Sequence, residues 1–307
     1  MKWSWLAPHY WPTWIGMGLM RLLAALPYRV SYRIGLGLGA LMRQLPLRHN
    51  TVARVNIQLC LPEFDARQRE ILLARHSDSL GIAICETALA WYATDAKLRS
   101  LAQIHGAENL RAALAAGNGV ILLASHFTTL EIGARFCALH WPLNIVYRPS
   151  NNALLGEFQG RCRDRLARRA IRRDDIRSMV AALKANEIVW FAPDQSYRKK
   201  GAQMVPFFGI AAATNPATSR LARMTGAAVL PYFVERLPQG AGYVVRIDAA
   251  LQNFPSTDTA ADALRVHHLI EAHVRRVPEQ YLWIHRRFKG TTPDYPDYYA
   301  PDRFAPD

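Results

Sequence analysis

His126 and Glu131 are the two residues of this chain whose types and spacing best suit acid–base chemistry. They open and close the segment HFTTLE at 126–131, which directly follows the apolar run GVILLA at 119–124. A carboxylate bonded to one ring nitrogen of a histidine fixes the tautomer and makes the other nitrogen a better base. The segment therefore predicts that His126 takes a proton from an alcohol and that Glu131 orients its ring.

The elements around this pair decide whether the two side chains can meet. On one straight helix, residues five apart differ in direction by about 140° and do not face each other. If a strand ends at Ala124 and a helix begins near Thr129, His126 lies on the connecting loop and Glu131 in the first helical turn, where the helix dipole favours a carboxylate. The alternative is a strand-end histidine and a helix-start glutamate with no catalytic role, since such a pair also occurs by chance.

Two more polar segments follow predicted strands. Tyr147-Arg148-Pro149 ends the next strand after the HFTTLE segment, and Pro193-Asp194-Gln195 ends a further one. In open α/β sheets, ligands bind outside the carboxyl ends of the strands. We therefore expect these three strand ends to converge on one pocket.

A cluster of arginines occupies a predicted helix and its exit. One interpretation is a solvated helix face balanced by Asp164, Asp174 and Asp175, and the other is a surface that docks phosphates or an acidic carrier protein. The cluster comprises Arg161, Arg163, Arg165, Arg168, Arg169, Arg172 and Arg173.

Composition narrows the class of protein. The 307 residues contain 38 Lys and Arg against 24 Asp and Glu, a formal net charge of +14 that favours an anionic membrane face, an acidic protein or nucleic acid as partner. No nucleic-acid recognition module is evident, because aromatic residues do not interleave with the basic ones. The four cysteines form no CxxC pair, which indicates free thiols and no structural metal site. HExxH, GxSxG and phosphate-binding glycine motifs are absent, and the other histidines, His285 included, match no pattern of ligands or catalysts.

The start of the chain is apolar and rich in aromatic residues. The runs 11–26 and 34–42 are both shorter than the ~18–20 apolar residues of a confident membrane-spanning helix. A cleaved signal peptide, a buried helix and a spanning or in-plane membrane anchor are the possible interpretations, and we favour the anchor. Arginines follow the first run while a single lysine precedes it, so a spanning segment would leave the main domain in the cytoplasm.

The remaining sequence alternates between strand and helix patterns. This alternation predicts an α/β fold with a mostly parallel central sheet and helices on both faces. We expect a hydrophobic membrane anchor over 1–45 and a catalytic domain over 46–307. The predicted strands are 120–124, 144–147, 187–191, 227–233 and 243–247, and the predicted helices are 64–93, 129–140, 152–170, 174–185, 214–225 and 259–277.

The chain resembles the late lipid A acyltransferases of Gram-negative bacteria, the lauroyl/myristoyl transferase family of lipopolysaccharide synthesis, and its first residues are most similar to the Kdo-dependent lauroyltransferase branch. The resemblance runs in order along nearly the whole chain and implies a fold like that of glycerolipid acyltransferases. It rests on HFTTLE at 126–131, VYRPSNN at 146–152, GRCRDR at 160–165, VWFAPDQSY at 189–197, VPFFG at 205–209 and PEQYLWIHRRFK at 278–289.

The resemblance implies transfer of a fatty acyl group from acyl carrier protein to a hydroxyl of a hydroxyacyl chain on a lipid A precursor that bears Kdo sugars. His126 would be the general base, Glu131 its orienting partner and Arg163, ahead of Arg161, the donor to the oxyanion. Arg148, Asp194 and Gln195 would shape the acceptor pocket, with Arg161 as a further substrate contact. The implied enzyme needs no cofactor or metal and works at the cytoplasmic face of the inner membrane.

Two other functions stay open at this point. One is acyl transfer to another lipid, such as a lysophospholipid or an amino-acid lipid. The other is a non-catalytic lipid-binding or assembly protein.

Overall fold

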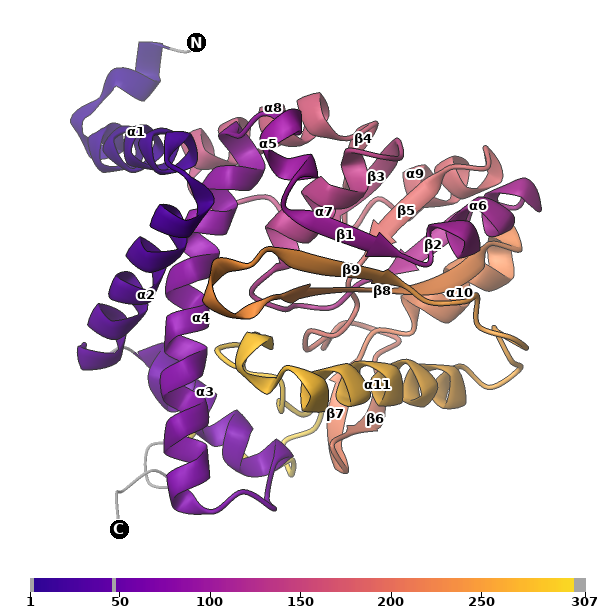
Figure 1. Cartoon of the computed structure of the whole chain (residues 1–307). Coiled ribbons are helices and arrows are strands. Elements are labelled where there is room, and N and C mark those ends of the chain that lie inside the picture. Colours follow the sequence, from indigo (N-terminus) through magenta and orange to yellow (C-terminus); the bar gives the residue numbers. More distant parts are fainter. Residues whose placement is uncertain (1–2, 46–47, 301–307) are drawn as a thin grey trace.

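The strands and helices of the chain alternate, and seven of the strands form one sheet (Figure 1). The computed structural model describes residues 3–45 and 48–300. The strand order is β1-β9-β8-β2-β5-β3-β4, and a separate hairpin joins β6 to β7. The strands are β1 (Ala102–His105), β2 (Val120–Leu123), β3 (Leu143–Tyr147), β4 (Arg169–Arg172), β5 (Ile188–Phe191), β6 (Gln203–Phe207), β7 (Ile210–Thr214), β8 (Ala228–Arg236) and β9 (Tyr243–Ile247).

The sheet is mostly parallel, as predicted. Val120 of β2 lies beside Ile188 of β5 and beside Ala228 of β8, both in parallel register. Only β8 and β9 pair in the antiparallel direction among the described strands of this sheet. All five predicted strands are confirmed, as β2, β3, β5, β8 and β9, whereas the sequence analysis missed both edge strands and the hairpin.

Helices cover both faces of this sheet. They are α1 (Trp11–Ala25), α2 (Tyr28–Gln44), α3 (Arg48–Cys60), α4 (Ala66–Tyr92), α5 (Asp95–Arg99), α6 (Ala107–Ala115), α7 (Leu130–Ala138), α8 (Ala153–Leu166), α9 (Ile176–Lys184), α10 (Ala217–Thr225) and α11 (Thr259–Arg276). Short 3-10 turns lie at Trp3–Leu6, Pro8–Tyr10, Pro238–Gly240 and Pro278–Gln280.

The period of two along each strand divides the core into two clusters. Ile121 and Val189 pack with residues of α9, α10 and α11 on one face. Val120 and Ile188 pack with residues of α4, α6 and α7 on the other. Every residue of β2 and β5 is buried, which explains why the sequence shows them as continuous apolar runs rather than alternating ones.

The predicted helix 152–170 is wrong at its end. Helix α8 stops at Leu166, and Arg169 to Arg172 form the edge strand β4. The backbone of this strand forms hydrogen bonds with β3, and in their parallel register Arg169 lies beside Asn144 and Arg172 beside Tyr147. Part of the arginine cluster therefore lies along the sheet edge instead of on a helix face.

The apolar start of the chain folds into two helices separated at Pro27. Within the described residues, no helix has the length and apolar character needed to cross a membrane. Helix α1 has 15 residues, so it extends about 22 Å, against the ~30 Å of a bilayer core. Four of its exposed side chains are large and apolar and recur at three- or four-residue intervals: Trp11, Ile15, Leu19 and Leu22. The charged Arg21 is also exposed on this helix.

Helix α2 lies directly against α4, and glycines make this contact possible (Figure 1). A Cβ atom at Gly39 would lie 2.4 Å from the Cα of Asp78, and one at Gly81 would lie 2.2 Å from the carbonyl oxygen of Gly35. Gly37, between the two α2 glycines, has no heavy atom within 4 Å of its Cβ position. The two backbones therefore touch at Gly35, Gly39 and Gly81, while Gly37 faces open space.

This geometry predicts opposite effects for two neighbouring substitutions. Gly39→Ala should lower the free energy of unfolding by about 1–3 kcal/mol or more, because the backbones must separate. Gly37→Ala should leave it unchanged or raise it by up to about 1 kcal/mol, because alanine favours the helix. Denaturant unfolding of both variants in the same detergent measures the difference, and equal stability of the two would contradict the close crossing.

Candidate active site

Three adjacent strands bring the predicted polar segments to one edge of the sheet. β2, β5 and β3 are neighbours and run parallel, so their carboxyl ends meet. His126 follows β2, Asp194 follows β5 and Arg148 follows β3. The three strand ends meet at one edge of the sheet as predicted, but they do not line one pocket. His126 and Arg148 line the same cavity, whereas Asp194 lines small spaces beside it.

Asp194 holds both the ring and the backbone of His126. Its Oδ1 accepts a hydrogen bond from Nδ1 of His126 at 2.7 Å, and its Oδ2 accepts one from the His126 backbone N–H at 2.9 Å. Burial by itself would raise the pKa of Asp194, but the charge and hydrogen bonds of His126 outweigh it and hold the pKa below its usual value. An ionised Asp194 fixes the proton on Nδ1 and leaves Nε2 as the basic nitrogen. Within the described part of the chain, no hydrogen bond occupies that Nε2.

The prediction that Glu131 orients the ring of His126 is wrong, because Asp194 takes that place. Glu131 Oε1 accepts a hydrogen bond from Arg163 at 2.9 Å, and its Oε2 accepts one from the Trp91 indole at 3.3 Å. The physical reason is the sheet: the loop after β2 lies beside the loop after β5, so the nearest carboxylate comes from the neighbouring strand. Glu131, in the first turn of α7, faces α4 and α8 instead.

Arg163 lies in the same cavity as His126 with part of its guanidinium unused. Its Cζ is 5.1 Å from the centre of the Tyr147 ring, and Nη2 donates to Glu131. The Nη1 atom is buried and has no hydrogen-bond partner among the described residues. Buried donors are rarely left unpaired, so this nitrogen is suited to an oxygen of a bound molecule.

An apolar cavity of about 190 Å³ begins beside these polar groups. Its polar lining includes His126, Glu131, Arg148 and Arg163, together with Arg135 and Tyr147. Its apolar wall continues along α7, α8 and the sheet through Ala134, Ala138, Ile145, Leu166 and Trp190. A charged, hydrogen-bonding mouth on an apolar cavity fits a ligand with a polar reacting group and a hydrocarbon part.

The remaining predicted residues lie at different depths. Arg148 is exposed and lines the cavity mouth. Arg161 lies outside the cavity wall and pairs with Glu157 of its own helix at 3.1 Å. Gln195 lines a small space of about 10 Å³ beside His126 and His285.

A layer behind Asp194, which the sequence analysis did not identify, supports this carboxylate. The Tyr281 hydroxyl donates to Oδ2 at 3.3 Å. The buried Arg287 donates to the carbonyl oxygen of Ala213 at 2.8 Å and brings a positive charge near Asp194. Nε2 of His285 accepts a hydrogen bond from the Ser196 backbone N–H at 3.0 Å. Burial, and to a smaller extent the charge of His126, lowers the pKa of His285 to about 4, so this histidine is neutral at pH 7. In the sequence, these residues stand out only as part of segment 278–289, which is rich in aromatic and basic residues. That composition does not predict contact with Asp194.

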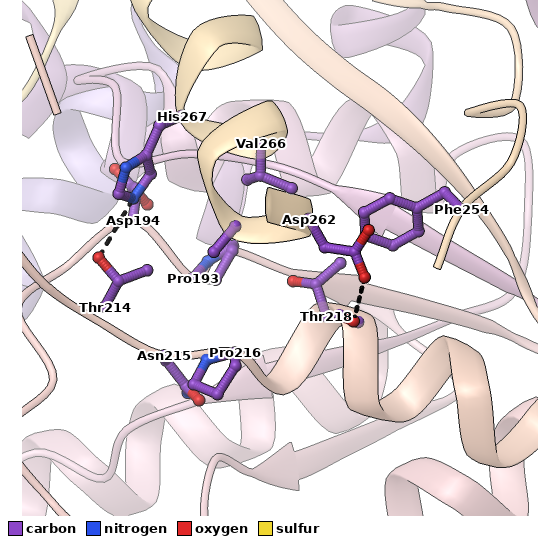
Figure 2. Close-up of a pocket in the computed structure, with 12 residues that line it drawn as sticks. Pro193, Asp194, Thr214, Asn215, Pro216, Thr218, Phe254, Asp262, Val266 and His267 are labelled. Atoms are coloured by element: carbon purple, nitrogen blue, oxygen red, sulfur yellow. Dashed lines mark hydrogen bonds between the residues drawn. The ribbon is translucent and has the colours of Figure 1, made fainter. Parts of the chain in front are cut away.

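Figure 2 shows the enclosed space on the far side of Asp194, with His267 and Thr214 beside it. Its volume of about 10 Å³ has room for about one water molecule. This space behind the carboxylate is therefore too small for any ligand larger than a water molecule. Among residues 3–45 and 48–300, no group of three or more His, Cys, Asp or Glu side chains could hold a metal ion, and all four cysteines are free and buried.

The arrangement combines an oriented base, a buried cation with a free donor and an apolar cavity. The base can take a proton from a hydroxyl, and the cation can stabilise an oxyanion formed beside it. Both act on a molecule whose hydrocarbon part the cavity can hold.

Comparison with known proteins points to the same chemistry. Residues 1–290 match the family model described as bacterial lipid A biosynthesis acyltransferase. The lipid A biosynthesis palmitoleoyltransferase of Escherichia coli (strain K12) is 40% identical over 285 residues, which are 92% of this chain and 93% of that protein. The lipid A biosynthesis lauroyltransferase of the same strain is 36% identical over 295 residues, 96% of each chain. The myristoyltransferase of that strain is 24% identical over 295 residues, 93% of this chain and 89% of its own length.

Proposed function

Because the chain belongs to the bacterial lipid A biosynthesis acyltransferase family and is an acyltransferase, we propose that it transfers a fatty acyl group from acyl carrier protein to a hydroxyl on a hydroxyacyl chain of a Kdo-bearing lipid A precursor. The observation that carries this proposal is the His126–Asp194 pair at the mouth of an apolar cavity. An alcohol acceptor needs a base, and an acyl chain needs an apolar site.

In this reaction Nε2 of His126 takes the proton of the acceptor hydroxyl. The oxygen attacks the thioester carbonyl, and the new C–O bond gives a tetrahedral intermediate with an oxyanion. Collapse of this intermediate breaks the C–S bond. The imidazolium then gives its proton to the departing thiolate of the carrier protein. Asp194 holds the ring and stabilises the imidazolium, and the step needs neither a covalent enzyme intermediate nor a cofactor.

Arg163 is the proposed donor to the oxyanion of the tetrahedral intermediate. Its unpaired Nη1 and its place in the cavity support this role over Arg161, which lies on the outside of α8. Glu131 holds Nη2 and thereby fixes the direction of the guanidinium. Glu131 thus acts on the oxyanion donor rather than on the base.

Charge supports the choice of substrates. Lipid A precursors are phosphorylated and acyl carrier protein is acidic, and both suit a chain of net charge +14. Arg148 at the cavity mouth is the proposed contact for an anionic group of the acceptor, with Arg161 as an outer contact. Gln195 is proposed to shape the floor beside His126.

The exposed apolar side chains of α1 and α2 support an anchor that lies in the plane of the inner membrane, at its cytoplasmic face. On α2, Val30, Ile34 and Leu41 are exposed, four and seven residues apart. Arg29 and Arg33 lie beside them and can reach lipid phosphates.

The central test separates the two carboxylates. His126→Ala and Asp194→Asn should each lower kcat/KM by roughly 10²-fold or more, because the base or its orientation is lost. Glu131→Gln should have a smaller effect, of about tenfold, because the base stays oriented. The matched control is Asp174→Asn, an exposed carboxylate paired with Arg172, which should keep the parental rate.

The assay is the gain in lipid mass when detergent-solubilised protein is given acyl-carrier-protein thioesters and Kdo-bearing precursor. A parental rate in His126→Ala would overturn the mechanism. If the parent protein gives no product with any of the donors, the acceptor must be another lipid.

The cavity makes a prediction about acyl length. Ala138 lines the cavity seven residues along α7 from Glu131, a separation of about 10 Å along the helix axis. Ala138→Leu should shift the preferred donor to a chain shorter by two or more carbons, because each buried CH₂ contributes about 0.8 kcal/mol. Donors of graded length in one competition assay measure the shift; Ala112→Leu, at an exposed position on α6, is the control. An unchanged preference in Ala138→Leu would place the acyl chain elsewhere.

The anchor makes a separate prediction. Replacing Ile15 and Leu22 together with glutamate should lower the fraction of protein that floats with anionic liposomes several-fold, since both side chains are at least 64% exposed on α1. Replacing the exposed Ile176 of α9 and Met224 of α10 with glutamate makes the same change in charge and polarity on other helices. Equal flotation of the two double variants would contradict an anchor on α1.

A further inference from the structure

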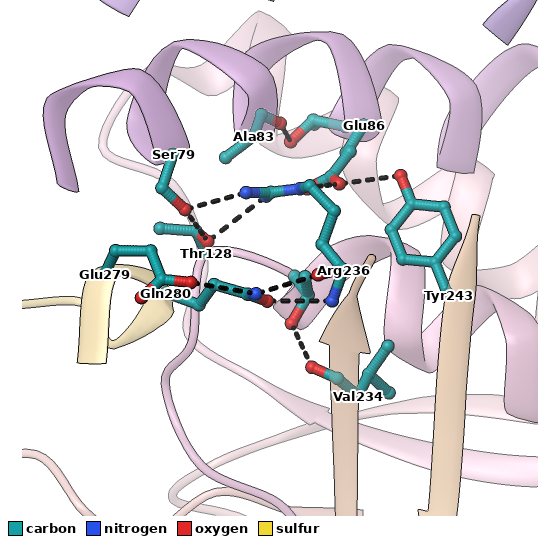
Figure 3. Close-up of polar contacts among 11 residues, drawn as sticks. Ser79, Ala83, Glu86, Thr128, Val234, Arg236, Tyr243, Glu279 and Gln280 are labelled. Atoms are coloured by element: carbon teal, nitrogen blue, oxygen red, sulfur yellow. Dashed lines mark hydrogen bonds and ion pairs between the residues drawn. The ribbon is translucent and has the colours of Figure 1, made fainter. Parts of the chain in front are cut away.

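A buried ion pair with no part in the proposed acyl transfer lies behind the loop of His126. Arg236, the last residue of β8, donates to both carboxylate oxygens of Glu86 on α4, from Nε at 2.5 Å and from Nη2 at 2.6 Å. The side chains are only 5% and 1% exposed. Tyr243 adds a third hydrogen bond to Glu86 at 2.6 Å, as Figure 3 shows.

Stability alone does not account for this pair. Desolvation of two charges offsets most of their attraction, and well-packed apolar residues often serve stability as well or better. Burial by itself would lower the pKa of Arg236, but Glu86 outweighs it and raises the pKa, so the arginine stays charged. A charged guanidinium with several donors fixes the direction of each group that it contacts.

Those donors reach the loop that carries His126. Nη1 of Arg236 donates to the Ser79 hydroxyl at 2.7 Å, and Nη2 donates to the Thr128 hydroxyl at 3.2 Å (Figure 3). The two hydroxyls also lie 2.7 Å apart, within hydrogen-bond distance. Thr128 is two residues beyond His126, so the ion pair contacts the loop just behind the base.

The backbone of Arg236 holds the same loop from its other side through Gln280. The Gln280 side chain accepts from the Arg236 N–H at 2.8 Å and donates to the Arg236 carbonyl oxygen at 3.0 Å. The Gln280 carbonyl oxygen accepts from the Thr128 N–H at 2.7 Å, and the Leu282 N–H donates to the His126 carbonyl oxygen at 2.9 Å. The backbone on both sides of Phe127 is therefore tied down.

We propose that Arg236, Glu86, Ser79 and Thr128 form a brace that positions the backbone of His126, so that Nε2 stays at the cavity mouth. None of the four lines the cavity, so they are positioning residues that act through the loop. This inference rests on the proposed role of His126 as the base. Misplacing a reacting group by about 1 Å can lower a rate 10²-fold, so loss of one contact in the brace should be visible in kcat.

Two serines on α4 give a matched test. Ser79 and Ser77 are both buried, but the Ser77 hydroxyl donates to the Leu73 carbonyl oxygen of its own helix at 3.0 Å. Ser79→Ala should lower kcat about tenfold or more with KM for donor and acceptor within about twofold of the parent. Ser77→Ala should keep kcat within about twofold of the parent.

Thr128 gives a second and independent test. Thr128→Val removes the hydroxyl and keeps the shape, so kcat should fall as in Ser79→Ala. Thr128→Ser restores the hydroxyl and should recover most of kcat, a rescue that loss of packing would not produce. Thermal unfolding of every variant is measured in the same detergent, and rates are expressed per folded protein.

The outcomes separate the brace from the proposed function. A parental kcat in both Ser79→Ala and Thr128→Val overturns the brace. If His126→Ala is inactive in the same assay, the proposal that His126 is the base still stands. Equal losses in Ser77→Ala and Ser79→Ala, or no rescue by Thr128→Ser, also overturn it, because they indicate general loosening of α4. An active His126→Ala overturns the proposed function itself.

Discussion

The two hydrogen bonds that Asp194 accepts from His126 join the ends of β2 and β5, and the rest of the site depends on this junction. One buried carboxylate fixes both the ring and the backbone of the same residue. A buried carboxylate is tolerable only when its oxygens are satisfied, and here the Tyr281 hydroxyl and the nearby charge of Arg287 add to the two hydrogen bonds from His126. The segment 278–289 must therefore fold onto the loop after β2, although more than 150 residues of sequence separate them.

Polar and apolar surroundings divide sharply at His126. Behind it lie Asp194 and the ion pair of Arg236 with Glu86, and in front of it lies the cavity between α7, α8 and the sheet. In the proposed reaction, a hydrocarbon chain in that cavity excludes water, which strengthens the electrostatic effect of Arg163 on a developing oxyanion. The same division lets the proposed brace position the proposed base without touching substrate.

The sequence was sufficient for the inner strands of the sheet but not for its edge strands or for the contacts between neighbouring loops. Buried parallel strands such as β2 and β5 form continuous apolar runs, so their positions and the convergence of His126, Arg148 and Asp194 were predictable. The partner of His126 was not, because spacing along the chain favoured Glu131 while sheet order placed Asp194 beside the ring. Edge strand β4 was missed for a similar reason: an arginine-rich stretch follows the helix pattern until β3 offers its free backbone groups.

Helix α4 connects the proposed anchor to the site. Its 27 residues extend about 40 Å, and different faces of it contact α2 through Gly81, the His126 loop through Ser79 and the cavity through Trp91. Ser79 and Glu86 are seven residues apart and so share one face, which explains how both reach Arg236. If α1 and α2 lie in the membrane plane, this single rigid helix fixes the height of the cavity mouth above the lipid. In that arrangement the proposed base would meet an acceptor hydroxyl that stays at the membrane interface.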